Sequence, residues 1–328
     1  MDHSPPVTAQ TNVSGSAVSV AAVVVTFNRK ELLVDCIEHL LEQSRSLNKI
    51  ILVDNASTDD THGMLKELGI LERPEIEFLP LAENSGGAGG FHAGLSLALK
   101  GDCDWFWLMD DDAIPEPEAL EALLAVSPNM KNIYASSAVF PDDDQGETLC
   151  WPAVCKHEDT HDEKIVIRRH ADLNDIEEVS AVPFLGFMVS RNIVETIGLP
   201  DKGFFISGDD IDYGERAKQT RAKIFLVKHS KLSHPAPADY RVNFLGITFF
   251  CLRLDPWRRY YDVRNRVLIA RRYFGSRLWT QTIPGLVVRM LATLWYEPHR
   301  FRQVCTYSKG IKDGLLGRVG KRVEPGSL

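Results

Sequence analysis

The sequence predicts an α/β fold: a mostly parallel, twisted sheet with helices on both faces, followed by a basic helical region. First, short valine-rich apolar runs alternate with segments of helical period. Second, 328 residues that are 44% hydrophobic can build one large domain with an appendage. Third, residues 1–250 contain 21 basic and 40 acidic side chains, whereas residues 251–328 contain 16 and 5. This asymmetry predicts an anionic partner for the C-terminal region.

Each predicted strand is a short apolar run. Residues 18–26, with the sequence VSVAAVVVT, form a continuous run that is typical of a strand buried on both faces. Similar runs follow at 49–53, 76–80 and 105–109. Between them, apolar residues recur at intervals of three and four, which predicts helices and therefore βαβ units. The predicted helices cover 30–42, 57–68, a stretch from the glycine cluster at 84–94 to about Leu99, and 115–126.

The chain is expected to have three parts. Residues 1–17 are rich in Ser, Thr, Pro and Gly and are expected to be disordered. Residues 18–250 are expected to form the main domain. Within it, residues 141–178 read as an insertion with one hairpin, because they are charged and lack a clean period. Residues 251–328 are expected to form the basic helical region.

Composition and the missing motifs exclude several protein classes. Six cysteines are too few for a disulfide scaffold, which favours a reducing compartment. The N-terminal residues lack the basic and apolar segments of a secretory signal. No apolar run reaches the roughly 18–20 residues that a spanning helix needs. The chain is therefore expected to be cytoplasmic.

Polar clusters follow the predicted strands where each strand ends. TFNR at 26–29, DNAS at 54–57 and DDD at 110–112 follow three of the strands, and NSGGAGG at 84–90 opens a helix. In an open parallel sheet, ligands bind at the carboxyl ends of the strands, and a glycine-rich helix start favours anions. The clusters therefore predict one nucleotide crevice. Neither the dinucleotide fingerprint nor a P-loop is present, which argues against a nicotinamide enzyme or a P-loop ATPase.

The aspartate triplet predicts a cation site. Packed carboxylates repel one another, so a folded site needs a cation to hold them. If strand geometry continued, Asp110 and Asp112 would point to the same side. Carboxylate oxygens that also face a diphosphate suit Mg²⁺ or Mn²⁺. A second triplet at 142–144 lacks a preceding apolar strand and is expected to be a surface loop.

A second acidic cluster, DDIDYGER at 209–216, follows the apolar segment GFFI. These residues allow two interpretations. A positioned carboxylate can act as the base when an acceptor hydroxyl attacks the anomeric carbon of a sugar with inversion. Alternatively, the cluster is a helix start whose acidic first turn is favoured by the helix dipole.

Five motifs then occur in a fixed order: TFNRKELL, ILVDNASTDDT, NSGGAGGFHAGL, WLMDDDAIPEPEAL and FLGFMVSRNIVETIGLPDKGFFISGDDIDYGERA. In this order they resemble the family 2 glycosyltransferases of the GT-A fold, a Rossmann-like fold. NSGGAGGF with a DDD triplet is most similar to the galactofuranosyltransferase branch, with rhamnosyltransferases as near neighbours. The match covers about residues 18–240, and YYDVRNRV and GIKDGLLGRVGK extend it toward the C-terminus.

The resemblance implies a role for each matching position on the donor side. Asp110, Asp112 and His234 would hold Mn²⁺ or Mg²⁺ on the donor diphosphate, with His229 as a weaker match. Arg29 and the metal would offset charge on the leaving UDP. The residues implied to meet or border the nucleotide sugar are Thr26, Asn28, Arg29, Asp54, Asn55, Asn84, Gly86, Gly87 and Asp111.

On the acceptor side, the resemblance makes Asp210 the catalytic base. Asp209 and Asp212 would support acceptor hydroxyls or orient that base. Phe187 belongs to the acceptor platform and is expected to contact the acceptor. That platform, residues 184–187, contains no tryptophan, which leaves the acceptor preference open.

The resemblance implies a metal-dependent inverting hexosyltransferase, with residues 18–250 as its GT-A catalytic domain. It would move galactofuranose from UDP-galactofuranose to a glycan or a polyprenyl-linked acceptor during cell-envelope polysaccharide synthesis. One alternative is a rhamnosyltransferase that uses dTDP-rhamnose. Another is an inactive GT-A domain that serves as a scaffolding or binding subunit. A sugar-phosphate nucleotidyltransferase would need a glycine-rich basic loop after the first strand, and that loop is absent.

The basic C-terminal helices combine arginine with aromatic residues, which suits an anionic membrane surface. The protein is therefore expected to be peripheral on the cytosolic face of the inner membrane. A solvated charged face over core aromatics is the alternative, and no motif supports nucleic-acid binding. Whether the chain forms a homo-oligomer stays open. The aromatic residues concerned are Trp257, Tyr260, Tyr261, Phe274, Trp279, Trp295 and Tyr296.

Four residues between 150 and 161 have types that can bind zinc. Cys150, Cys155, His157 and His161 lie closer together than in the usual arrangement of two separated pairs. A structural zinc site and a mixed polar loop both remain possible interpretations.

Overall fold

The computed structural model describes residues 18–141, 148–156, 164–236 and 238–326. The expected disorder of residues 1–17 and the expected surface loop at 142–144 lie outside these ranges, as do His157 and His161. Both expectations, and the possible zinc site that includes the two histidines, therefore stay predictions.

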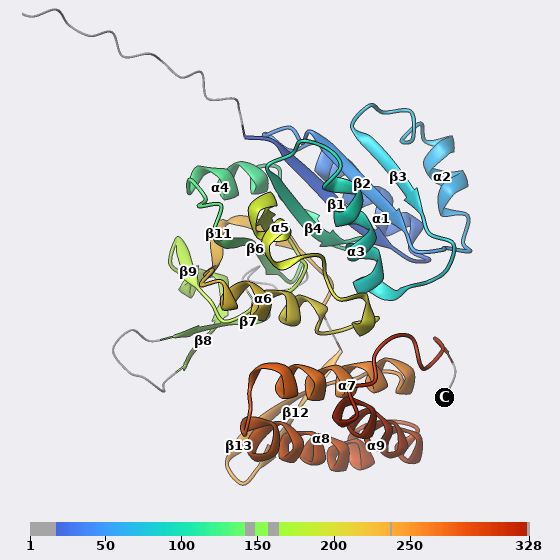
Figure 1. Ribbon diagram of the computed structural model, residues 1–328, viewed down its shortest axis with the longest axis vertical. Coiled ribbons are helices and arrows are strands. Elements are labelled where there is room, and N and C mark those ends of the chain that lie inside the picture. The colour runs from blue at the N-terminus through green and yellow to red at the C-terminus, as the bar shows by residue number, and fades with distance from the viewer. Residues whose placement is uncertain (1–17, 142–147, 157–163, 237, 327–328) are drawn as a thin grey trace, which may run out of the picture.

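The described residues form an 11-stranded mixed sheet whose main order is β3-β2-β1-β4-β10-β6-β11-β5 (Figure 1). β1 pairs in parallel with both β2 and β4, as its continuous apolar run predicted, while β10 runs antiparallel between β4 and β6. The strands of the main order are β1 Val20–Thr26, β2 Lys49–Asp54, β3 Ile76–Pro80, β4 Trp105–Asp110, β5 Ile114–Pro115, β6 Ile133–Val139, β10 Phe187–Ser190 and β11 Ile224–Ser233.

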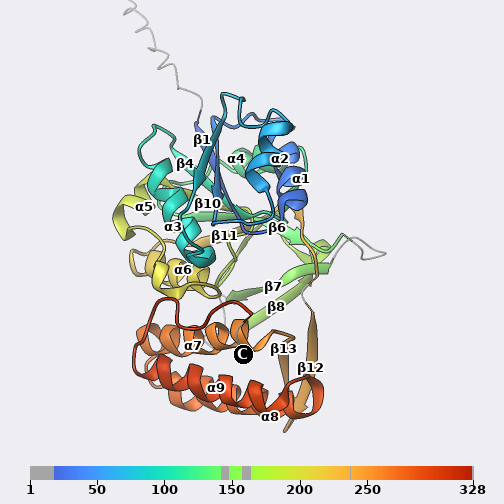
Figure 2. The same ribbon diagram turned by 90° about the vertical axis from the view of Figure 1, so that its right-hand side faces the viewer.

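Helices cover both faces of this sheet, and Figure 2 shows α3, α5 and α6 on one side with α1, α2 and α4 on the other. The alternation of side chains along each strand explains the two layers, since Val23 and Leu108 belong to one core while Val24 and Trp107 belong to the other. The helices of the sheet region are α1 Lys30–Leu41, α2 Thr61–Glu67, α3 Gly86–Ala98, α4 Ala119–Ala125, α5 Arg191–Ile197 and α6 Asp209–Gln219.

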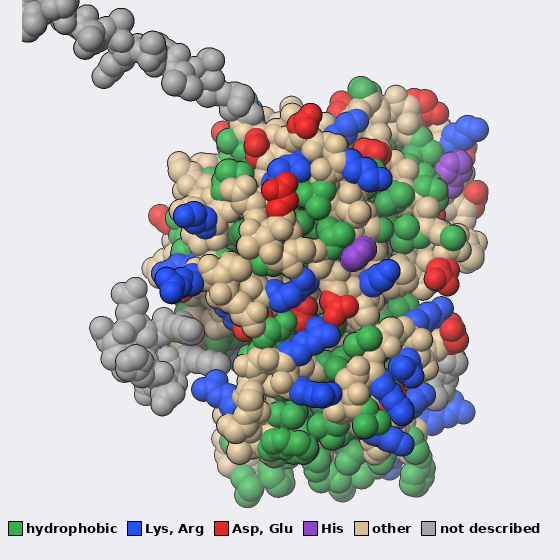
Figure 3. Space-filling model, viewed as in Figure 1, with side chains coloured by type: hydrophobic (Ala, Val, Ile, Leu, Met, Phe, Trp, Pro, Cys, Tyr) green, Lys and Arg blue, Asp and Glu red, His purple; other side chains and the backbone are tan. Residues whose placement is uncertain are grey.

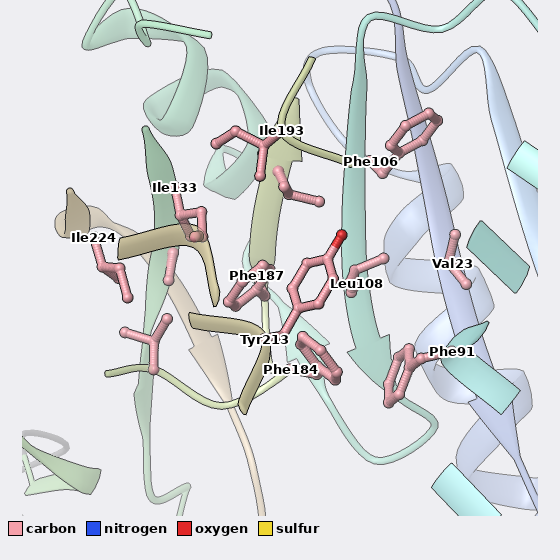
Figure 4. Packing of buried hydrophobic residues seen from close by; sticks show 14 of the residues in the cluster. Val23, Phe91, Phe106, Leu108, Ile133, Phe184, Phe187, Ile193, Tyr213 and Ile224 are labelled. Carbon is pink, nitrogen blue, oxygen red and sulfur yellow. The ribbon is translucent and has the colours of Figure 1, made fainter. Parts of the chain in front are cut away.

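The core on the α3 and α6 side also supports the acidic end of α6. Tyr213 of α6 packs against Phe184 and Phe187, and the ring of Phe91 of α3 lies tilted against that of Phe184 with ring centroids 4.7 Å apart (Figure 4). These side chains are nearly inaccessible to solvent. Their burial fixes α6 against the sheet, so the carboxylates in its first turn are held on a rigid element.

The helix predicted at 115–126 begins later, at Ala119. Ile114–Pro115 instead forms β5, which pairs with the end of β11. Pro115 and Pro117 explain the shift, because a proline disfavours helical backbone in the residue that precedes it.

The region predicted as an insertion is attached to the main sheet. It contains the expected hairpin, formed by β7 (Thr148–Lys156) and β8 (Lys164–Arg169). β7 also pairs with β6 at Val139 and Leu149, and β9 (Ile176–Glu178) pairs with β11. The loop-rich stretch therefore adds strands at one side of the sheet.

The C-terminal part combines a hairpin with three helices. β12 (Asp239–Phe244) and β13 (Ile247–Leu252) form a separate two-stranded sheet, so the boundary predicted at 250 falls inside β13. Helices α7 (Pro256–Tyr273), α8 (Ile283–Tyr296) and α9 (Arg300–Leu315) then pack around their own small core. Within the described ranges, the structure contains no helix with the length and apolar character needed to cross a bilayer.

Candidate active site

A cavity of about 470 Å³ lies between the strand ends of the sheet and helix α7. One wall comes from the ends of β1, β2 and β4 together with the start of α3, as the strand-end clusters predicted. The opposite wall comes from the loop before α6 and from α7. The predicted site residues that line this cavity are Thr26, Arg29, Asn55, Asn84, Gly86, Gly87, Asp110, Asp111, Asp209 and Asp210.

The aspartate triplet does not continue as a strand. β4 ends at Asp110, and Asp111 and Asp112 form a turn, so the three side chains point to different surroundings. Asp110 and Asp111 line the cavity, whereas Asp112 does not. The expectation that Asp110 and Asp112 share one side through strand alternation is therefore wrong, because the backbone turns after Asp110.

Arg29 and Thr26 hold the triplet together. Arg29 Nη1 lies 2.6 Å from Asp112 Oδ2 and 3.2 Å from Asp111 Oδ1, and the Thr26 hydroxyl donates to Asp111 at 2.7 Å. Burial would lower the pKa of Arg29, but the adjacent carboxylates of Asp111 and Asp112 raise it above its ordinary value. The guanidinium therefore stays charged beside the carboxylates.

Among the residues that the structure describes, Asp110 has no such partner. Burial, followed by the charges of Asp112, Asp111 and Asp209, raises the pKa of Asp110 well above its ordinary value, although Arg29 opposes the shift. The influence of Asp209 is informative, because this residue stands on α6, about a hundred positions further along the chain. The two acidic clusters therefore face the same space.

Asp112 and His234 form the part of the site that best fits a divalent cation. His234 Nε2 lies 3.3 Å from Asp112 Oδ1. Asp112 Oδ1 and His234 Nδ1 are both buried without a hydrogen-bond partner among the described residues. Burial would raise the pKa of Asp112, but His234 and Arg29 outweigh it and lower that pKa. An ionised carboxylate that lies 3.3 Å from an imidazole nitrogen suits Mn²⁺ or Mg²⁺.

As the side chains stand, no group of three or more His, Cys, Asp and Glu residues in the described part of the chain is arranged as a complete metal site. His229, the weaker candidate, is exposed and pairs with Asp175. Cys150 and Cys155 are buried, and burial raises the pKa of each thiol to about 12.

The first turn of α6 supplies the second acidic cluster. Asp209 and Asp210 both line the cavity. Burial and the neighbouring charge of Asp210 raise the pKa of Asp209 to about 8, and burial raises the pKa of Asp210 to about 6. A carboxylate with a pKa near 6 is ionised at neutral pH and can still take up a proton, as a general base must.

Helix α7 holds the loop that leads into these aspartates. Asn265 Nδ2 donates to the carbonyl oxygens of Phe204, Ile206 and Ser207 at 3.0, 2.9 and 2.7 Å. Phe205 and Ser207 adopt positive φ angles of 64° and 70°, which are unfavourable for residues with side chains. The buried amide of Asn265 therefore compensates for a strained loop.

Arg264, the neighbour of Asn265, donates from Nη2 to the carbonyl oxygens of Gly203 and Phe204, at 3.0 and 2.7 Å. The YYDVRNRV motif supported the resemblance, but its role was not predicted from the sequence. The signal that could have revealed it is an Arg-Asn pair on a helix rich in buried aromatic residues.

The glycine cluster serves packing more than anion binding. A side chain at Gly86 would meet the Phe205 carbonyl oxygen at 1.9 Å, and the amide of Ala88 donates to that oxygen at 3.1 Å. Added side chains at Gly90 and Gly94 would collide with Val25 and Val23 of β1. The helix start predicted to attract an anion is thus partly occupied by the chain itself.

Two predicted donor residues lie beside the cavity rather than on its surface. Asn28 Oδ1 accepts a hydrogen bond from the Thr58 amide at 2.6 Å, and Asp54 Oδ1 accepts one from the Ser57 amide at 2.9 Å. Both side chains therefore brace the two loops that follow β1 and β2. Asn55 continues the bracing, because its Oδ1 accepts from the Ser85 amide at 2.9 Å.

Two predicted acceptor residues point away from the cavity, which corrects the sequence-based expectation. Phe187 is completely buried in the core of Figure 4, and its neighbours Phe184 and Leu185 line the cavity instead. Asp212 is also completely buried, pairing with Arg216 at 3.2 Å and with Arg272 at 2.8 Å. The helical turn explains this placement of Asp212, since two positions after Asp210 the side chain faces the opposite side.

Comparisons with known proteins agree with this architecture. The family model described as "Glycosyl transferase family 2" matches residues 21–196. Galactofuranosyltransferase GlfT1 of Mycobacterium tuberculosis (strain ATCC 25618 / H37Rv) is 28% identical over 313 residues, covering 93% of this chain and 96% of the relative. The dTDP-rhamnosyl transferase RfbF of Shigella flexneri is 25% identical over 256 residues, with 77% and 80% covered.

Among solved structures, GalNAc-T7 with UDP, GalNAc and Mn²⁺ aligns with a TM-score of 0.58 at 14% identity. The alignment covers 89% of this chain but 55% of that one, so this chain spans about half of its length. At this identity the likeness concerns the fold alone, and the shared fold is GT-A.

Proposed function

The chain belongs to glycosyl transferase family 2 and is a glycosyltransferase, and from this premise we propose that it is a metal-dependent, inverting enzyme that transfers galactofuranose from UDP-galactofuranose. The single observation that carries the mechanism is the shared cavity, in which the donor-side carboxylates Asp110 and Asp111 face the α6 carboxylates Asp209 and Asp210. The similarity to a galactofuranosyltransferase over nearly the whole of both chains supports the choice of sugar.

In the proposed reaction, Asp210 is the general base. The oxygen of the acceptor hydroxyl attacks the anomeric carbon, the proton of that hydroxyl passes to the Asp210 carboxylate, and the bond between the anomeric carbon and UDP breaks. UDP leaves with the bonding electron pair, and the anomeric centre inverts. Arg29, which lines the cavity, offsets negative charge on the departing diphosphate.

Asp112 and His234, together with Asp110, are the residues proposed to hold Mn²⁺ or Mg²⁺. When bound, the ion supplies Lewis-acid stabilisation of the diphosphate. Asn55, Asn84 and Gly87 are proposed to border the nucleotide, since they line the same wall. Asp209 is proposed to lie beside the acceptor, with Phe184 and Leu185 in the platform role that was expected of Phe187.

The proposed acceptor is a glycan or a polyprenyl-linked sugar, used at the cytosolic face of the inner membrane during cell-envelope synthesis. We further propose that residues 18–250 form the catalytic domain and that α7, from the region after 250, completes its cavity. Trp257, Arg258 and Arg266 of α7 line the cavity and support this proposal.

A dTDP-rhamnose donor is the second candidate, favoured by the similarity to the Shigella flexneri rhamnosyltransferase. The experiment that separates the two is a donor panel of UDP-galactofuranose, UDP-galactopyranose and dTDP-rhamnose, each with Mn²⁺, Mg²⁺ or EDTA. We expect UDP-galactofuranose to be used best and EDTA to stop transfer. If dTDP-rhamnose is turned over faster, it is the donor instead of UDP-galactofuranose. Turnover that EDTA leaves unchanged would refute the proposed role of the metal.

A further inference from the structure

The end of the molecule farthest from the nucleotide side exposes large apolar side chains. Leu245 and Phe301 are each 86% exposed, and Trp295 is 72% exposed. Figure 3 shows a continuous apolar area at this end of the molecule, below α7 and over the β12–β13 hairpin and α8 of Figure 1. We call it the apolar end and define it as Phe244, Leu245, Ile247 and Phe250 of the hairpin, Val287, Leu291, Trp295 and Tyr296 of α8, and Phe301 of α9.

The tip of the β12–β13 hairpin is unfavourable as a surface that only water contacts. Leu245 and Gly246 form the two-residue turn between β12 and β13, with φ angles of 49° and 78°. Turns with two positive φ angles favour Asn, Asp and Gly, and a leucine is strained there. A strained and almost fully exposed leucine therefore indicates that the tip meets an apolar environment.

Helix α8 presents a matching stripe. Val287, Leu291 and Trp295 recur at intervals of four and are all exposed. The charged residue of this helix, Arg289, turns away from the stripe and donates to the Phe250 carbonyl oxygen at 3.2 Å. Tyr296 at the end of α8 stacks on Tyr240 of the hairpin with ring centroids 5.1 Å apart, which joins the two elements.

Positive charge accompanies the apolar end. Residues 240–304, all of which the structure describes, contain 12 arginines and 3 acidic residues. Two of these arginines, Arg259 and Arg264, are buried, and two others, Arg258 and Arg266, line the cavity, so eight remain for the surface. Two of the three acidic side chains, Asp262 and Glu297, are buried. Arg168 and Arg241 lie over the ring of Phe250, at 4.4 and 5.1 Å from its centroid. Arginines beside exposed aromatic rings fit an interface of lipid headgroups.

We propose that the apolar end docks on the surface of a bilayer that carries anionic lipids. The Leu245 tip and the α8 stripe enter the boundary between headgroups and acyl chains, and the adjacent arginines meet the anionic headgroups. A single monomer rarely exposes so large an apolar area without an occupant, and the excess of arginine favours an anionic lipid surface over a second, equally basic copy of the same end.

Docking at the apolar end would bring the cavity close to a lipid-linked acceptor, and this part of the inference rests on the proposed function. Strand β13 begins at Ile247 in the apolar end and finishes at Leu252, which lines the cavity. At about 3.3 Å per residue, the strand spans roughly 17 Å. A sugar attached to a membrane lipid through a short polar headgroup can therefore reach the cavity while its lipid stays in the bilayer.

The test measures binding of the full chain to vesicles of phosphatidylcholine alone and of phosphatidylcholine mixed with phosphatidylglycerol. We expect binding to the mixed vesicles, with roughly tenfold weaker binding for Leu245→Glu and roughly hundredfold weaker binding for Leu245→Glu combined with Trp295→Glu. The matched control is Leu68→Glu, an exposed leucine after α2 on the sheet region, which should bind as the unchanged chain does.

Transfer to a water-soluble acceptor, measured on the same variants, separates docking from catalysis. We expect this transfer to be unchanged, because no substituted side chain lines the cavity. If transfer is absent but vesicle binding follows the apolar end, the proposed function fails and the docking surface stands. Equal binding by the double variant, or equal binding to uncharged vesicles, overturns the proposal. A dimer that the double variant dissociates, without vesicle binding, also overturns it.

Discussion

The two acidic clusters of the cavity have similar sequences and different surroundings. Asp111 and Asp112 follow β4 and have Arg29, Thr26 and His234 as partners, whereas Asp110 ends the strand without such a partner among the described residues. Asp209 and Asp210 open α6, and within the described residues neither forms an ion pair. Their pKa values are raised to about 8 and about 6 through burial.

The difference shows how one residue type acquires two functions. Asp112, which lies beside Arg29 and His234, has a lowered pKa, keeps its charge and suits the binding of a divalent ion. Carboxylates buried without a cation hold protons more strongly and suit proton transfer. The role of each cluster therefore depends on its neighbours, and the following experiments act on the neighbours or on the carboxylates themselves.

The largest effect is expected from Asp210→Asn, because an amide cannot accept the acceptor proton. We expect transfer to fall roughly 10²–10⁴-fold while donor binding is retained. The comparison is Asp102→Asn, an exposed aspartate before β4, which should leave the rate unchanged. Steady-state transfer and donor titration measure both quantities. A normal rate in Asp210→Asn would show that Asp210 is not the base.

The next largest effect is expected in the cluster that follows β4, on its affinity for Mn²⁺. Asp112→Asn removes the ionised partner of His234 and Arg29, and we expect affinity for Mn²⁺ to fall roughly 10–100-fold, with transfer falling in parallel. Titration of Mn²⁺ by electron paramagnetic resonance gives the affinity. Asp175→Asn, which changes the carboxylate that pairs with the exposed His229, is the matched control. Equal Mn²⁺ affinity in both variants would remove Asp112 from the metal site.

The pH profile should distinguish the clusters without mutation. The base must be ionised, and burial raises the pKa of Asp210 to about 6. We therefore expect kcat/KM to be constant above this value and to fall about tenfold for each pH unit below it. Rates measured at saturating Mn²⁺ keep the metal site filled. An acid limb near pH 4, the ordinary carboxyl range, would contradict the desolvated environment of Asp210.

Asn265→Ala removes the amide that holds the loop before α6, and it leaves the carboxylates of both clusters unchanged. It leaves three loop carbonyl oxygens without their donor, so we expect kcat to fall about tenfold and the free energy of unfolding to fall by about 2 kcal/mol. Asn265 is a positioning residue, so KM for the donor should change little. Arg271→Ala, which loses one contact inside the helical region, is the control and should keep its kcat.

The last effect concerns stability in the metal-free protein. Burial raises the pKa of Asp209 from 3.8 to about 8, so the folded chain keeps a proton that the unfolded chain has released between these values. The contribution of Asp209 to stability is therefore lost as pH rises, by at most about 1.4 kcal/mol per pH unit. Denaturant unfolding should show a weaker decline in Asp209→Asn. If the free energy of unfolding declines identically with pH in both proteins, the raised pKa is not that of Asp209.

The elements of the nucleotide half could be predicted because their signals are local. The valine-rich run of β1, the helical period of α1 and the strand end at Asp110 each lie within a few residues of sequence. The ordered motifs added the family and the GT-A fold. The β12–β13 hairpin was missed, although β12, with the sequence DYRVNF, alternates polar and apolar residues.

The sequence by itself determined which carboxylates stand at strand ends and at helix starts, because backbone propensity and side-chain period are properties of short segments. Only the tertiary structure decided that Asp212 and Phe187 point into the core and that Asn265 holds the loop before α6. Those outcomes depend on the direction in which helices and turns cross one another. That direction is fixed when distant surfaces pack, and no local pattern encodes it.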